Sequence, residues 1–159
     1  MTELVREYGP NGWQTGAPEG GGLQPEQTEY ISLDITVPGD SSNVFVPFAL
    51  GPSTGYEVLD LSDPTSPVAL VAAVYAVSVT VGWSAATAPG RATLEVDLDA
   101  ADFSWYVRQD NDLSTTLATN SAASLTVFIP EGGTIQVVLM QTSGADAFAQ
   151  RVTTAVQRF

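Results

Sequence analysis

The feature that most limits how this chain can fold is a two-residue alternation between large apolar side chains and small or polar ones. It is clearest in residues 75–83 (YAVSVTVGW), where Tyr75 and three valines alternate with small residues, and it recurs in residues 91–99 (RATLEVDLD). Because successive side chains of a strand point to opposite faces, both segments are predicted to be half-buried strands. A helix is disfavoured, since Val and Thr fit a pleated sheet better.

Shorter segments of the same character follow from Tyr30 onward, separated by turn residues. In the first, Ile31, Leu33, Ile35 and Val37 are predicted to share one face. The other candidate strands are NVFVPFAL (43–50), YEVLDL (56–61), FSWYV (103–107), LSTTLAT (113–119), SLTVFIP (124–130), TIQVVLMQ (134–141) and AFAQRVTTAVQRF (147–159). Many short strands without a convincing long helix predict an all-β fold, an antiparallel jelly-roll sandwich.

A Gly- and Pro-rich stretch precedes these strands. Residues 9–27 hold six Gly and three Pro, and they have too few apolar residues to fold alone. We therefore predict an extended N-terminal arm over residues 1–28 and a jelly-roll domain over residues 29–159. Trp13 lies in this arm without a local core. Its side chain is either exposed to solvent without a role in binding or an anchor in a pocket of a neighbouring protein, and we favour the anchor.

Composition excludes several classes of function. Acidic residues number 18 against five basic residues, all of them Arg, which leaves a net charge of −13. Such a field repels phosphate, so neither nucleic acid nor an anionic membrane is expected as a partner. His, Cys and Lys are absent, which removes Ser-His-Asp triads, thiol chemistry and Cys-ligated zinc. We expect no enzyme activity, no metal and no cofactor.

Two acidic segments are the remaining candidates for chemistry. Glu95, Asp97 and Asp99 fall on one face of a predicted strand, roughly 6–7 Å apart. We interpret them as a solvated strand face, with a calcium site and a glycosidase-like carboxylate pair as alternatives. The segment RQDND, residues 108–112, has the composition of a turn, with metal ligation as the alternative.

The strand TIQVVLMQ is apolar on both faces, because Val138 and Met140 oppose Ile135, Val137 and Leu139. A strand in a monomeric sandwich normally shows one face to water. The second face is therefore covered either by a loop of the same chain or by another subunit. We favour the subunit, because charged residues make up only 14% of the chain and leave much neutral surface for contacts.

Residues 75–159 resemble the jelly-roll head shared by tumour necrosis factor and the complement first-component subunits. The resemblance rests on YAVSVTVGW, RATLEVDLD, SLTVFIP, the Gly turn and apolar strand of EGGTIQVVLMQTSG, and a last strand that ends in Phe159. One departure is Thr134 after Gly132 and Gly133, where the family commonly has Gly-Asp. The resemblance implies a compact homotrimer in which Tyr75 and Phe159 are core or interface aromatics.

Similar heads occur in phage virions, as capsid decoration trimers and on tail fibres. We therefore expect a structural virion protein, made in the host cytoplasm and placed on the capsid surface beside the major capsid protein. The alternative is a receptor- or glycan-binding head at a tail tip, where Trp105 and Tyr106 stack on sugar rings. The candidate partner-binding residues are Trp13, Leu23, Tyr75, Val138, Met140 and Phe159.

Overall fold

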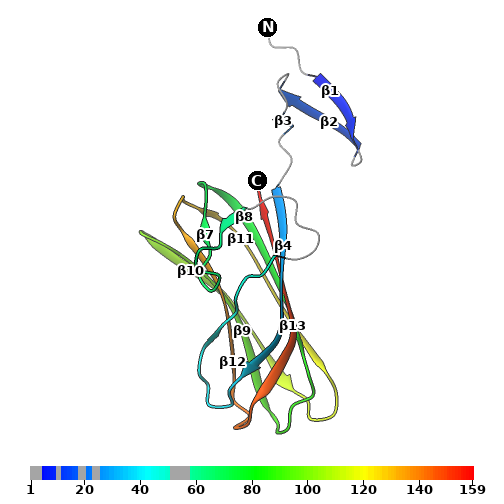
Figure 1. Ribbon diagram of the computed structural model, residues 1–159, viewed down its shortest axis with the longest axis vertical. Helices are drawn as coiled ribbons and strands as arrows, with labels where there is room; N and C mark the ends of the chain where they lie inside the picture. The colour runs from blue at the N-terminus through cyan, green and yellow to red at the C-terminus, as the bar shows by residue number, and fades with distance from the viewer. Residues whose placement is uncertain (1–4, 10–11, 18–20, 23–25, 51–57) are drawn as a thin grey trace.

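The computed structural model describes residues 5–9, 12–17, 21–22, 26–50 and 58–159. Within these ranges the regular structure is all strand, and no helix could cross a membrane. Strands β1 (Val5–Gly9), β2 (Gly12–Ala17) and β3 (Gly21–Gly22) form a small antiparallel sheet of their own (Figure 1). Backbone pairing therefore occurs within the part of the chain that was predicted to be an extended arm.

The remaining strands form two antiparallel sheets that pack as a sandwich (Figure 1). The first sheet has the order β11 (Thr119–Ile129), β8 (Ala73–Trp83), β13 (Ala147–Arg158), β4 (Glu26–Val37). The second has the order β10 (Phe103–Leu113), β9 (Gly90–Ala100), β12 (Thr134–Gln141), β7 (Val68–Ala69), β6 (Leu59–Asp60), and β5 (Val44–Phe45) also pairs with β12. The chain crosses between the sheets after β4, β7, β8, β10, β11 and β12, which confirms the predicted jelly-roll sandwich.

The core lies between the two sheets and follows the predicted alternation. On β8 the buried side chains are Tyr75, Val77, Val79, Val81 and Trp83, and on β9 they are Ala92, Leu94, Val96 and Leu98. The indole N–H of Trp83 donates to Ser121 Oγ at 3.1 Å, and Asn111 Nδ2 donates to the same oxygen at 2.8 Å. This buried polar link joins β8 and β11 to β10 of the opposite sheet.

Strand β4 departs from the prediction that Ile31 and Leu33 share a face with Ile35 and Val37. Its first half instead buries Thr28, Tyr30 and Ser32, and Leu33 is 63% exposed. The faces exchange at Asp34, which has a left-handed φ of 54°. One residue with a left-handed φ is enough to move every later side chain of the strand to the opposite face, because the period of a strand is two.

The cause of this reversal lies in the neighbouring strand β13. Its register with β8 shifts between Ala149 and Arg151, so Gln150 is an extra residue, a β-bulge. In the pairing of β13 with β4, Ala149 faces Ile35 and Arg151 faces Leu33, which places Asp34 at the level of the bulge. The two strands therefore change faces together and stay paired.

Three boundaries also differ from the prediction. Residues 108–112 are part of β10 rather than a turn, because they pair in register with β9 and their polar groups find partners across the strands. For example, Thr93 Oγ1 donates to Asp110 Oδ1 at 2.6 Å. The expected strand at 113–119 is mostly a bend between β10 and β11, and β4 already begins at Glu26, inside the predicted arm.

One end of the sandwich is held together by the side chain of Gln141, which is fully buried. Its Nε2 donates to the backbone oxygens of Val37 and Ala145, and its Oε1 accepts from the amide of Ser143 at 2.7 Å. Gly39 packs against the backbone of Ala145 so closely that a Cβ would overlap it. A single amide thus links the ends of β4 and β12 to the turn that starts β13.

We expect Gln141→Leu to lower the free energy of unfolding by about 2–4 kcal/mol, because it leaves buried backbone groups without partners. Urea unfolding followed by tryptophan fluorescence measures this change. Gln150→Leu is the matched control, since Gln150 is exposed at the bulge, and its effect should stay within about 0.5 kcal/mol. Equal effects of the two substitutions would contradict the linking role of Gln141.

Candidate interaction surface

The outer face of the first sheet is built from small, uncharged side chains across three adjacent strands. We call this surface the neutral face; it consists of Ala76, Ser78, Thr80, Gly82, Asn120, Ala122, Ser124, Thr126, Thr153, Ala155 and Gln157. Thr80 lies between Ala122 and Thr153 in the register, so the rows are continuous from β11 to β13. The side chains of these rows are neutral in a chain of net charge −13, and charged side chains of the same outer face lie at their border: Arg151 faces Gly82 and donates from Nε to Thr153 Oγ1 at 3.2 Å, and Glu29 of β4 faces Ala155.

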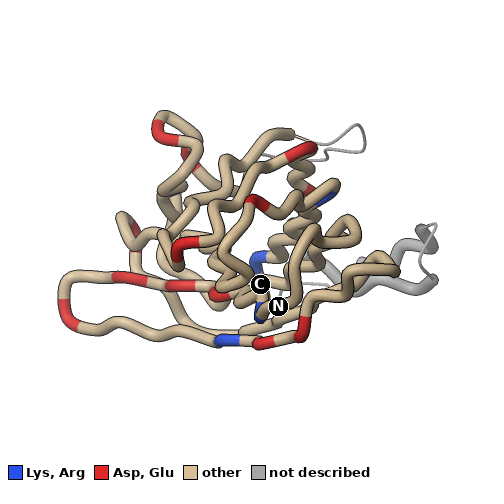
Figure 2. Tube along the Cα trace, turned by 90° about the horizontal axis from the view of Figure 1, so that it is seen from below, with Lys and Arg blue, Asp and Glu red and all other residues tan. Residues whose placement is uncertain are grey.

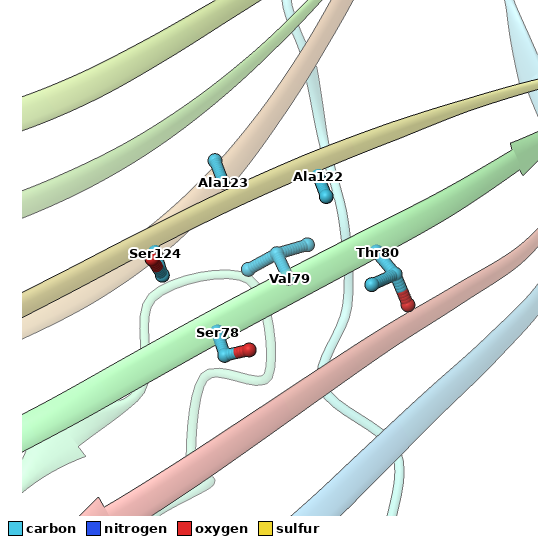
Figure 3. A pocket seen from close by; sticks show the side chains of 6 residues that line it. All are labelled: Ser78, Val79, Thr80, Ala122, Ala123 and Ser124. Carbon is cyan, nitrogen blue, oxygen red and sulfur yellow. The ribbon is translucent and has the colours of Figure 1, made fainter.

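The neutral face is hollowed between β8 and β11. A shallow cavity of about 180 Å³ is lined by Ser78, Val79, Thr80, Ala122, Ala123 and Ser124 (Figure 3). It exists because alanine and serine side chains are short, so the two strands leave a furrow between them. Its lining offers methyl and hydroxyl groups but no acid or base, so it suits an uncharged contact better than a chemical step.

Exposed apolar side chains lie at both ends of the neutral face. At one end, Leu70, Val71, Val74, Phe128 and Phe159 are 39–63% exposed, and we call them the end patch. Val74, Phe128 and Phe159 are neighbours, because Val74 faces Phe128 in the register and the amide of Phe159 donates to Val74 O at 3.0 Å; Leu70 and Val71 precede β8 in the chain. At the other end, beside the bulge, Leu33 is 63% and Phe148 is 47% exposed.

The structure places the predicted partner-binding residues in different surroundings. Phe159 is exposed and belongs to the end patch. Tyr75 is fully buried and donates its hydroxyl to Val71 O at 2.8 Å, so it is a core aromatic without surface for a partner. The backbone of Trp13 lies in β2, and Leu23 lies outside the described residues.

Val138 and Met140 correct the expectation that another subunit covers the second face of β12. Val138 is only 1% exposed within a single chain, where Phe45 and Glu95 flank it in the register. Its cover therefore comes from its own chain, which was the less favoured alternative. Met140 is half-buried on the same face. The predicted pattern of two apolar faces is present, and for Val138 the cover of the second face lies within one chain.

Trp105 and Tyr106 lie in strand β10 rather than in a recognition loop. They are 55% and 66% exposed. In the register they face Leu98 and Asp97, and as consecutive strand residues they point to opposite faces of the sheet. The two rings therefore cannot form one stacking platform for a sugar.

Glu95, Asp97 and Asp99 share the outer face of β9, as predicted. The pKa of Asp97 is raised to about 6, mainly by burial and additionally by the charge and hydrogen bond of Glu95 and the charge of Asp99. Arg108 faces Glu95 in the register, but its Nε contacts Asp110 Oδ1 at 3.2 Å.

The calcium alternative for these acids has no geometric support. Among the described residues, no three acidic side chains are grouped so that they could hold a metal ion. Figure 2 shows the acidic positions spread over many strands and turns instead. The solvated strand face remains the better interpretation of Glu95, Asp97 and Asp99.

We expect Asp97→Asn to raise the melting temperature at pH 7 by roughly 1–3 °C. Because the pKa of Asp97 is raised in the folded state, its stabilising contribution is complete below about pH 4 and is lost as the pH rises through about 6. The gain should therefore disappear at pH 3.5, as thermal unfolding at both pH values can show. Asp102→Asn, at the exposed β9–β10 turn, removes the same charge and serves as the control. An equal rise in melting temperature for this variant would show that the effect comes from net charge and not from the surroundings of Asp97.

Comparison with known proteins relates the chain to others by structure only. No protein-family model and no curated protein sequence matches it. Murine APRIL at pH 8.5 superposes with a TM-score of 0.61 at 9% identity, over 84% of this chain and all of that one. Murine APRIL at pH 5.0 gives 0.57 at 8% identity, again over 84% and 100%.

Eiger TNF from S. frugiperda superposes with a TM-score of 0.59 at 12% identity, over 85% of this chain and 92% of that one. The matched portion is large in both proteins, whereas the identity is at the level of unrelated sequences. The likeness therefore establishes the fold alone, and that fold is the tumour necrosis factor-like jelly roll.

Proposed function

We propose that this protein is a non-catalytic structural component that assembles into a homotrimer and serves as a decoration protein on a phage capsid. The neutral face carries the proposal. Each copy has a net charge of −13, so two copies repel each other over most of their surfaces. They can approach with the least electrostatic cost along the neutral rows of β8 and β11, away from the acidic face of β9.

The ends of the neutral face supply the hydrophobic contribution to assembly. Apolar surface stabilises a contact by about 25 cal/mol per Å², and stable interfaces bury about 800 Å² per partner. Phe128 and Phe159 at one end and Leu33 and Phe148 at the other are large side chains that remain 47–63% exposed in one chain. Covering them while the small residues meet in between would offset the entropy lost on association.

The trimeric state is favoured by the fold. The resemblance to the tumour necrosis factor head implies a homotrimer, and superpositions over more than four fifths of the chain establish that fold. A closed ring of subunits also satisfies every interface, whereas an unclosed contact would grow into a filament.

The virion role is supported by the fold and by the sequence. Jelly-roll heads of this type serve as decoration trimers in virions, and a short chain with a Gly- and Pro-rich arm fits that use. The chain would be made in the host cytoplasm and would then bind the major capsid protein on the capsid surface. Each trimer would bridge several capsid subunits and so raise the resistance of the shell to internal pressure.

A glycan- or receptor-binding head of a tail fibre is the second candidate. Trp105 favours it, because a tryptophan that is 55% exposed on an edge strand can stack on a sugar ring. It ranks second because Tyr106 points away from that ring's face, and the cavity of the neutral face holds no charged group to select a ligand.

We expect Ala122→Glu to weaken self-association at least about 100-fold, because each interface would then bury an unpaired carboxylate. Ala122 is exposed and lines the cavity, so the fold itself should tolerate the change. Light scattering coupled to size exclusion would report a trimer for the wild type and a monomer for the variant. Ala101→Glu, at the exposed β9–β10 turn, adds the same charge elsewhere and should remain trimeric. A monomeric wild type would refute the proposal.

The virion role has its own test. The wild-type protein should co-sediment with mature capsids assembled from the major capsid protein of the same phage, and Ala122→Glu should reduce its occupancy, since trimers bind through several sites at once. Binding is measured by quantitative gel electrophoresis of the pelleted particles. Absence of wild-type protein from the pellet, together with binding to glycans on an array, would favour the tail-fibre alternative.

A further inference from the structure

Strand β11 forms one edge of the first sheet, and its side chains do not protect that edge. Among the described residues, β11 pairs only with β8, in one unbroken register from Thr119 to Ile129. Every second residue of such a strand directs its N–H and C=O away from the partner, so the other side of β11 is a template for a further strand. The sequence TNSAASLTVFI holds no charge and no proline that would discourage pairing.

The other edges of the sandwich carry features that normally prevent the addition of a strand. Strand β10 has three charged side chains: Arg108, Asp110 and Asp112. Strand β4 is interrupted by the left-handed Asp34, and the amide of Ile31 donates to Ala49 O at 2.7 Å on its outer side. Strand β6 has only two residues. Within the described ranges, β11 is therefore the one long edge strand that lacks such protection.

Beside this edge, the second sheet extends beyond the cover of the first. The core-facing side chains Val96 and Leu98 of β9 are fully buried. Val107 and Trp105 of β10 face them in the register and so point to the same side of the sheet. Val107 is nevertheless only half-buried, and Trp105 is 55% exposed. The first sheet therefore covers β9 and leaves part of β10 open.

The uncovered part of β10 continues along the edge of β11. Near the turn between the two strands they are joined, because Asn111 Nδ2 donates to Asn120 O at 3.0 Å and to Ser121 Oγ at 2.8 Å. Farther along β11, Leu125 and Val127 lie on the core side of the strand but are only half-buried. One additional strand beside β11 would cover these two side chains and the open row of β10 together.

We propose that the free edge of β11 is a docking site for an extended segment of a partner protein, which joins the first sheet as an additional strand. Main-chain hydrogen bonds to β11 hold the segment, and the alternation of side chains sets its chemistry. Its inward side chains meet Trp105 and Leu125 and are therefore apolar, whereas its outward side chains extend the neutral rows of β11 and are small and uncharged. The net charge of −13 disfavours acidic residues in the segment.

A partner segment of this composition fits the edge better than a second copy of the chain does. Pairing β11 with its own copy would bring together two molecules of net charge −13, with Asp110 and Asp112 of each β10 beside the junction. The chain's own N-terminal segment enters the sandwich through β4, at the opposite edge of the first sheet. The inference goes beyond the proposed function, because it concerns a sheet edge and a different protein rather than contact between copies.

Peptide binding to the full chain tests this site. The probe is a fluorescently labelled nine-residue peptide, KVTVTVTVK, in which valine and threonine alternate between terminal lysines. Fluorescence anisotropy should show saturable binding of this peptide. The control peptide KVVVVTTTK has the same composition, and it should bind at least about 10-fold more weakly, because its valines no longer fall on one face. Equal binding of the two peptides would overturn the proposal.

Pairing through the backbone has a signature of its own. N-methylation of alternate amides removes the N–H groups from one edge of the peptide and leaves every side chain in place. Methylation of the valine amides and methylation of the threonine amides block opposite edges. One of the two forms should therefore lose binding while the other retains it, and equal behaviour of the two forms would overturn strand addition.

Two adjacent substitutions on β10 locate the bound peptide. Trp105→Ala should weaken binding at least about 10-fold, because Trp105 faces the added strand. Tyr106→Ala is the matched control, since Tyr106 is similarly exposed but lies on the opposite face of β10, and it should change binding by less than about twofold. Equal effects of the two substitutions would place the peptide elsewhere and overturn the proposal.

Light scattering of the same samples separates this inference from the proposed homotrimer. A trimeric protein that binds no peptide overturns the inference alone. A monomeric protein that binds the peptide and passes these controls supports the inference and refutes the homotrimer. Dimers that the peptide dissociates into monomers would assign the edge to a second copy and overturn the choice of a partner protein.

Discussion

Burial of one face of β8 against β9 and β12 is the interaction on which the rest of the structure depends. Tyr75 and Trp83 mark the ends of the buried row on β8, and Leu94 and Leu139 represent the opposing rows. Because strands alternate with period two, burying one row fixes where every other side chain of the strand must point. The apolar layer therefore decides the character of both outer faces as well as the stability of the core.

Because of this alternation, the outer face of the first sheet is largely neutral and the outer face of the second sheet is acidic. On β8 the positions left outside hold alanine, serine, threonine and glycine, which form the neutral face together with β11 and β13. On β9 they hold Glu95, Asp97 and Asp99, whose mutual repulsion helps to raise the pKa of Asp97 to about 6. The proposed contact between copies therefore falls on the neutral rows of the first sheet and avoids the acidic face of the second.

Period-two patterning was sufficient to predict the all-β fold, the buried row of β8 and the acidic face of β9. It failed at Leu33, because the bulge at Gln150 changes the faces of two strands and leaves no signature in the alternation of either. It failed at residues 108–112, since the polar groups of Asp110 and Asn111 have partners on other strands, Thr93 on β9 and Ser121 on β11, which the composition of the segment does not show. The neutral face needed the register as well, because only the register places Ala122, Thr80 and Thr153 side by side.

A flat face of small neutral residues permits association but specifies its geometry poorly. Serine, alanine and threonine have short side chains that offer few features to fix a register between subunits. Orientation must then come from the ends of the face, where Leu33 and Phe148 project beside the bulge and Phe128 and Phe159 project at the end patch. In the proposed assembly, these projecting side chains at the two ends of the face are therefore the elements that would fix one orientation between subunits.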